Sequence, residues 1–180
     1  MSNRIRVATA LATCGVVTAA VLYGDTPDTY AATSECTGVR PAHSMPLQRV
    51  LDHIDRLTAT RRHSAVYTGL SLDEDKDVVD VWRIPSAAFD ADVCDAVEKG
   101  VTVRLHDTDV NRRTLDALAD RIGEDMHRFD ATFELREVAV DERGWVSVGV
   151  DSLERAEPVL EKTFGAAHLK VEEVPQAELL

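Results

Sequence analysis

The sequence predicts an α+β fold in which helices cover one face of a mostly antiparallel sheet. Stretches with apolar residues at helical spacing alternate with short runs rich in β-branched residues. Polar turns separate pairs of these runs, as in hairpins. The order helix, strand, strand, helix, strand occurs twice, and equivalent positions are about 65–68 residues apart. We therefore interpret the chain as two αββαβ repeats, a first unit over 47–106 and a second over 107–174.

The first unit opens with a predicted helix and a hairpin. From Leu47 onward, apolar residues recur on one helical face. Two β-rich runs follow, 66–72 and 78–84, and the residues between them are all charged, which is typical of a hairpin turn. The acids of this turn resemble a calcium loop in their spacing. They lack the central glycine and the closing glutamate of such a loop, so a solvated turn is the better interpretation.

A second helix and a closing strand complete the first unit. Ser86 is a suitable N-cap for this helix. We expect it to continue to Lys99, because Gly100 is the kind of residue that ends a helix. The alternating run 101–105 predicts the closing strand.

The second unit is expected to repeat this order after an N-cap at Asp109 or Asn111. Glycines also interrupt two predicted strands, at Gly69 and Gly149, where glycine marks a bulge or the close approach of another backbone. The expected elements of the second unit are helices over 114–129 and 153–164 and strands over 133–140, 145–150 and 168–174.

A second division of the chain is open. Over 101–174 the order strand, helix, strand, strand, helix, strand is that of a ferredoxin-like split βαβ unit. The hairpin and helix of 66–99 would then extend or abut that sheet. The sequence alone does not choose between the two divisions.

The N-terminus predicts export. Arg4 and Arg6 precede an uncharged stretch over 7–24, and small residues follow around Ala31. These are the parts of a secretory signal peptide, which we place at 1–31. The alternative is that 7–24 is uncleaved and anchors the protein in a membrane, facing outside, since its length is near the lower limit for a span. The chain would contact a membrane only in that case.

The cysteines predict one disulfide. Cleavage of the signal peptide would remove Cys14 and leave Cys36 and Cys94, an even number in an oxidising compartment. Cys36 lies in 32–46, which is rich in small and turn-forming residues without periodicity, so we expect a linker or arm there. The bond would tie this segment to the second helix. Residues 175–180 are expected to be a tail.

Charge and motifs exclude several classes of function. The formal net charge of −12 at pH 7 argues against nucleic-acid binding, which requires clustered Lys and Arg. The sequence contains no familiar catalytic, nucleotide-binding or metal-binding motif, so we predict no catalytic residue, cofactor or metal. Trp82, Trp145 and His106 are the candidates for a binding surface. Packing of the two tryptophans between sheet and helices is the ordinary alternative.

The C-terminal part of the chain carries a recognisable pattern. A strand, a helix that ends in Phe-Gly and a closing strand follow one another, with marker positions 145–150, Ala156, Val159, Leu160, Phe164 and Gly165. This pattern resembles the prosegments of secreted bacterial serine proteases of the α-lytic type, mainly over 133–174 and more faintly over 66–106. The resemblance implies small α+β lobes that bind and inhibit a protease. No protease domain follows in this sequence, so we expect a relative that acts in trans.

We therefore expect an exported, non-enzymatic module that binds a protein or peptide, a secreted protease being one candidate partner. It would use a sheet edge, by strand addition, or a groove between the lobes. One alternative is a small enzyme with carboxylates and a histidine such as His106 in that groove. Another is a structural or anchored protein of the cell envelope.

Overall fold

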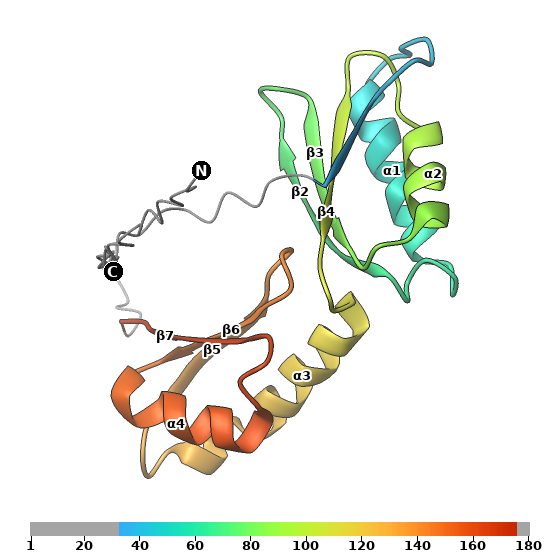
Figure 1. The fold of residues 1–180 in the computed structure, drawn as a ribbon. Helices are drawn as coiled ribbons and strands as arrows, with labels where there is room; N and C mark the ends of the chain where they lie inside the picture. The colour runs from blue at the N-terminus through green and yellow to red at the C-terminus, as the bar shows by residue number, and fades with distance from the viewer. Residues whose placement is uncertain (1–32, 176–180) are drawn as a thin grey trace, which may run out of the picture.

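The computed structural model describes residues 33–175, which form two sheets with two α-helices each (Figure 1). The predicted α+β class is confirmed. The predicted signal peptide, the alternative anchor over 7–24 and nearly all of the predicted tail lie outside the described residues. Within 33–175, no helix is long and apolar enough to cross a membrane.

The first lobe is a four-stranded sheet with the order β1-β4-β3-β2 and two helices on one face (Figure 1). β3 pairs antiparallel with β2 and parallel with β4, and β1 pairs antiparallel with β4. Its elements are β1 (Ser34–Thr37), α1 (Pro46–Thr58), β2 (Tyr67–Asp73), β3 (Val78–Arg83), α2 (Ala87–Asp95) and β4 (Thr102–Asp107).

The core of the first lobe lies between the sheet and its helices. Side chains of alternate strand residues point to one face, and the apolar stripes of α1 and α2 cover that face. The opposite, helix-free face carries Asp80, Trp82 and His106, because these residues alternate along β3 and β4 with the residues that face the helices. The fully buried core residues include Val50, Ile54, Val79, Val81, Phe89, Val93, Val103 and Leu105.

The segment over 32–46 is not simply a linker, because it contains β1. Thr33 N–H donates to the carbonyl of Leu105 at 2.8 Å, and the ladder continues along the edge of β4. The predicted disulfide is confirmed: Cys36 of β1 and Cys94 of α2 are bonded, with Cα atoms 5.7 Å apart. A strand of four residues is too short to show periodicity, which explains why the sequence did not reveal it.

The second helix is shorter than expected, since α2 ends at Asp95 and not at Lys99. The residues after it bind the N-terminal segment instead of continuing the helix. Lys99 N–H donates to the carbonyl of Arg40 at 2.9 Å, and the Glu98 carboxylate accepts the backbone N–H of His43 at 2.9 Å. That hydrogen bond lowers the pKa of Glu98.

The second lobe is a three-stranded sheet with the order β5-β6-β7, again with two helices on one face. The helix expected over 114–129 ends at Glu124, next to the weak helix former Gly123, and a tighter 3₁₀ turn follows. The elements are α3 (Arg112–Glu124), η1 (Met126–Phe129), β5 (Leu135–Val140), β6 (Val146–Val150), α4 (Leu153–Phe164) and β7 (Leu169–Glu173).

The ferredoxin-like division over 101–174 is wrong for this structure. That fold requires β4 to lie in one sheet with β5, β6 and β7. Instead β4 pairs with β3 and β1 and belongs to the first lobe. The helix α2 connects β3 to β4, which lies parallel to β3 in the same sheet. This pairing occupies one edge of β4, and the pairing with β1 occupies the other edge.

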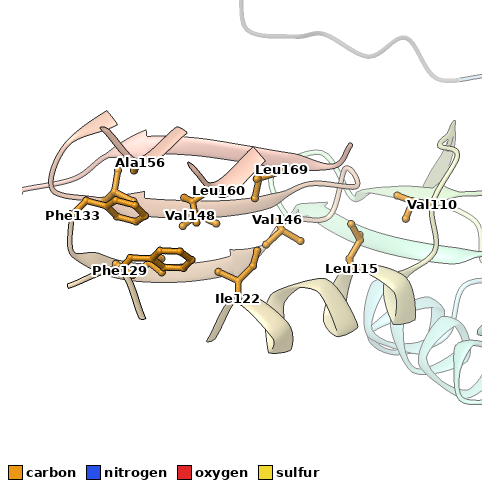
Figure 2. Packing of buried hydrophobic residues seen from close by; sticks show 12 residues of the cluster. Val110, Leu115, Ile122, Phe129, Phe133, Val146, Val148, Ala156, Leu160 and Leu169 are labelled. Atoms are coloured by element: carbon orange, nitrogen blue, oxygen red, sulfur yellow. The ribbon is translucent and has the colours of Figure 1, made fainter. Parts of the chain in front are cut away.

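The core of the second lobe is a continuous apolar layer between α3, α4 and the sheet. Figure 2 shows Val110 and Leu115 at the end near the first lobe and Phe129 and Phe133 at the other end. The two phenylalanine rings stack with centroids 5.1 Å apart. This layer buries Val146, Val148 and Val150 of β6 and Ala156 and Leu160 of α4.

The two lobes share one path. In each, a helix precedes an antiparallel pair, and a second helix leads to a strand parallel to the middle one. This common pairing is what the repeated order of elements leads one to expect. That the two halves are copies of one sequence stays a prediction.

Candidate functional site

The lobes meet where the tip of the β5–β6 hairpin lies against β2. A Cβ on Gly69 would stand 2.4 Å from the Cα of Glu142, so only glycine allows this approach. The register of β2 against β3 also shifts between Tyr67 and Gly69. The sequence offered a bulge or a close backbone as alternatives for Gly69, and the structure shows both.

Asp141 shapes the hairpin tip. Its Oδ1 accepts the backbone N–H groups of Arg143, Gly144 and Trp145 at 2.9, 2.9 and 2.8 Å. An aspartate that accepts from the residues following it favours a tight turn, and Gly144 adopts the positive φ of 108° that this turn needs. The turn therefore fixes the directions in which Arg143 and Trp145 leave the backbone.

Hydrogen bonds tie the start of α3 to the first lobe. The buried Thr68 hydroxyl donates to the carbonyl of Val110 at 2.5 Å and lies 2.7 Å from the Thr108 hydroxyl. Asn111 caps α3 by accepting the Thr114 N–H at 3.0 Å, and its amide donates to the Ala65 carbonyl at 3.2 Å. One of the two predicted caps, Asn111, is thus the cap observed, and it also links the lobes.

Two hollows adjoin at this lobe junction. The first, which we call the junction pocket, has a volume of about 310 Å³. The second, the α3 groove, has about 550 Å³ and shares Ala167 and His168 with the first. The junction pocket is lined by Asp107, Thr108, Asp109, Arg143, Gly144, Trp145, Ala166, Ala167 and His168.

His168 stands between the two hollows. Its Nδ1 lies 3.1 Å from the Gly144 carbonyl, which only accepts hydrogen bonds, so Nδ1 carries the proton. Its Nε2 is 3.7 Å from a carboxylate oxygen of Asp109. The Trp145 ring lies 6.1 Å from the imidazole, centroid to centroid. The pocket therefore offers an aromatic wall together with groups that donate and accept hydrogen bonds.

Arg83 holds in place the wall of the junction pocket that Asp107 forms. The buried Arg83 binds Asp107 and also binds both carboxylate oxygens of Asp90, at 2.6 and 2.9 Å. The hydrogen bonds that Arg83 donates to Asp90, and then the one that it donates to Asp107, raise the pKa of Arg83. This cluster joins β3, α2 and the end of β4, which makes it a structural support of the pocket wall.

The α3 groove has a different character. Its floor contains the half-buried side chains of Leu118 and Phe164, and its rim carries the exposed Arg113 and Arg121. The Arg121 guanidinium lies 5.7 Å above the centre of the Phe164 ring. The groove can thus accept apolar groups on its floor and anionic groups at its rim.

The structure separates the three predicted surface residues into two places. Trp145 lines the junction pocket. Trp82 and His106 lie on the helix-free face of the first sheet, stacked with centroids 4.7 Å apart, and each is only 5% exposed. His106 Nε2 lies 2.7 Å from an Asp80 oxygen, and Arg143 of the hairpin tip lies over Trp82 at 5.9 Å. The stack therefore supports the hairpin tip that carries Arg143.

Sequence reasoning did not single out four residues of the site: Arg143, His168, Arg113 and Arg121. The arginines of α3 had a detectable signal, since Arg113, Ala117 and Arg121 recur every fourth residue on one helical face. His168 had none, because its position follows from the loop that joins α4 to β7.

In the part of the chain that is described, no three His, Cys, Asp or Glu side chains converge in a way that could hold a metal ion. The comparisons add no family to this geometry. The chain matches no protein-family model, and no curated protein matches it.

Proposed function

We propose that this is an exported, non-enzymatic module that binds an extended segment of a partner protein at the lobe junction. The observation that carries the proposal is that the junction pocket and the α3 groove lie side by side and share Ala167 and His168 in their linings. An apolar floor with a few polar groups around it is the usual composition of a binding site. The hairpin tip and the capped start of α3 hold the two walls in place.

Export is supported by the bond between Cys36 and Cys94, because disulfides persist in oxidising compartments. In this proposal residues 1–31 are a cleaved signal peptide. The resemblance to protease prosegments makes a secreted protease the first partner to test, with the protein acting in trans. Inhibition of purified secreted proteases by the protein would support that choice of partner.

Strand addition remains a second mode of binding, and β5 is the edge that favours it. Asp141 N–H donates to the Trp145 carbonyl, so by the alternation of an antiparallel ladder the backbone groups of Val138 and Val140 face outward. Among the described residues these groups have no hydrogen-bond partner. An extended partner could pair with this edge.

The enzyme hypothesis is less well supported. It placed His106 in the groove, whereas His106 lies against Trp82 and Asp80 and lines neither hollow. His168 is the histidine of the site, and among the described residues Asp109 is the one acid with which it forms an ion pair. We therefore favour binding over catalysis.

A site-specific photo-crosslinker tests the proposal. Placed at Ala167, which is exposed and lines both hollows, it should capture a discrete partner from the secreting culture. The same group at Asp75, in the exposed β2–β3 turn, is the matched control. A third position, the exposed Ala139 of β5, reports strand addition at that edge.

The captured partner, once purified, should bind the unmodified protein, and Ala117→Trp should abolish that binding by filling the α3 groove. Equal capture at Ala167 and Asp75, or binding that is indifferent to Ala117→Trp, would contradict a site at the lobe junction. Capture confined to Ala139 would move the site to the β5 edge.

A further inference from the structure

The α3 groove has a charge opposite to that of the whole protein. The chain carries 32 acidic and 20 basic residues, a formal net charge of −12. No Asp or Glu lines the groove, although the chain as a whole is rich in both. The lining residues are Ala65, Asn111, Arg113, Thr114, Ala117, Leu118, Arg121, Phe164, Ala167 and His168.

The two arginines of the groove are available to a ligand. Within residues 33–175, neither Arg113 nor Arg121 forms an ion pair with a carboxylate. Their neighbour Arg112 does, with Asp116 at 2.7 Å, so pairing is possible on this helix and is absent on the groove side. The first turn of α3, which includes Thr114, adds the positive end of the helix dipole.

The spacing of the two arginines sets the distance between the ligand groups that can pair with them. Arg113 and Arg121 are eight residues apart on α3, which corresponds to about 12 Å along a helix axis. An extended peptide covers about 13 Å in four residues, and its residues i, i+2 and i+4 point to the same side. Leu118 and Phe164 lie on the floor of the same groove and offer an apolar surface.

We infer that the occupant of the α3 groove is an extended acidic segment of the pattern acid–x–apolar–x–acid. Its two carboxylates pair with Arg113 and Arg121, and the apolar side chain between them packs on Leu118 and Phe164. Carboxylates pair strongly with guanidinium groups because two parallel hydrogen bonds can form. The inference rests on the proposed function, since it names the chemical class of the segment that the junction binds.

Phage display tests this inference. A library of random peptides is selected for binding to the protein that is recovered after expression of the full chain. Enriched peptides should carry two acids four residues apart with an apolar residue midway. Synthetic copies, measured by fluorescence anisotropy, should bind the double variant Arg113→Gln, Arg121→Gln at least about tenfold more weakly. They should also bind more weakly as the salt concentration rises.

The matched control is Arg49→Gln with Arg56→Gln, which removes the same charge from exposed positions on α1. It should leave the affinity unchanged. Enriched peptides that are displaced by Ala117→Trp but lack acids, or that ignore the arginine variant, would overturn the acidic class and leave the junction site standing. If no enriched peptide is sensitive to Ala117→Trp, the inference and the proposed junction site both fail.

Discussion

The two lobes follow the same path and are stabilised differently. Each has an antiparallel pair extended by a parallel strand, with helices on one face. The first lobe adds a fourth strand and a disulfide, whereas the buried cluster of the second is entirely apolar. Among the described residues, every buried polar or charged side chain belongs to the first lobe: His63, Thr68, Arg83, Glu98 and His106.

This difference shows that one topology is compatible with two ways of stabilising it. The pattern of apolar residues sets the order of strands and the covered face in both lobes. The second lobe stacks Phe129 on Phe133 and relies on apolar burial. The first lobe is stabilised by the Cys36–Cys94 bond and by the ion pairs of Arg83.

The largest effect is expected from the disulfide. Replacing Cys36 and Cys94 by serine frees a loop with a sequence separation of 58 residues. Models of chain entropy put the loss in the free energy of unfolding at about 4 kcal/mol. Hydrogen exchange should show loss of protection in β1 and β4 and little change in β6 and β7. Equal loss in both lobes would mean that they unfold as one unit.

Leu160→Ala is the corresponding change in the second lobe. Leu160 is fully buried, so the cavity should lower the free energy of unfolding by about 3 kcal/mol. Denaturant unfolding should measure this loss of free energy, and hydrogen exchange should locate it in β5, β6 and β7. The neighbouring Glu161→Ala, at an exposed position, is the control and should have little effect. Loss of protection in β4 as well would break the contrast between the lobes.

Thr68→Val tests the link between them. It removes the buried hydroxyl that donates to the Val110 carbonyl, at an expected cost of about 1 kcal/mol. The same replacement at Thr163, whose hydroxyl bonds to Val159 inside the second lobe, is the control. Only Thr68→Val should raise exchange at the start of α3 and in the hairpin tip. If both variants act alike, the hydroxyl has no special role at the junction.

The smallest effect at neutral pH concerns Tyr67. Burial raises the pKa of Tyr67 to about 12, above the ordinary value of 10.0. Below pH 10 its contribution to stability is complete; as the pH rises toward 12, the unfolded chain loses this proton first and stability falls. The chain has three tyrosines, and cleavage after Ala31 would leave Tyr67 alone, so its absorbance can be followed directly. Ionisation near pH 10 in the folded protein would contradict its burial.

Most of the fold could be predicted from the sequence. Helical and alternating patterns located the helices α1 to α4 and the strands β2 to β7, and the cysteine count suggested the disulfide. The pattern failed at β1, at the end of α2 and at the end of α3, where η1 begins. At each of these places a contact distant in sequence or a tertiary packing demand decides the local structure. The β1 strand exists because Leu105 and its neighbours accept it as an edge.

The candidate site was much less accessible to sequence reasoning. Trp145 lies in it, while Trp82 and His106 support the hairpin tip from the face of the first sheet. Whether any of the three contacts a partner stays a prediction. Gly69 was recognised as a point of close approach, but its neighbour Glu142 could not be named.

The sequence by itself determined the class of fold and the order of elements from α1 to β7, and it suggested the pairing of Cys36 with Cys94. Those properties depend on local periodicity, turn chemistry and a count of cysteines, all of which can be read from the sequence. Only the tertiary structure decided that β4 joins the first sheet and that the hairpin tip meets β2. It also decided that Arg113 and Arg121 share a groove with Phe164. The physical reason is that the lobes meet through residues 40 or more positions apart, such as Thr68 and Val110, whose contact leaves no pattern in either segment.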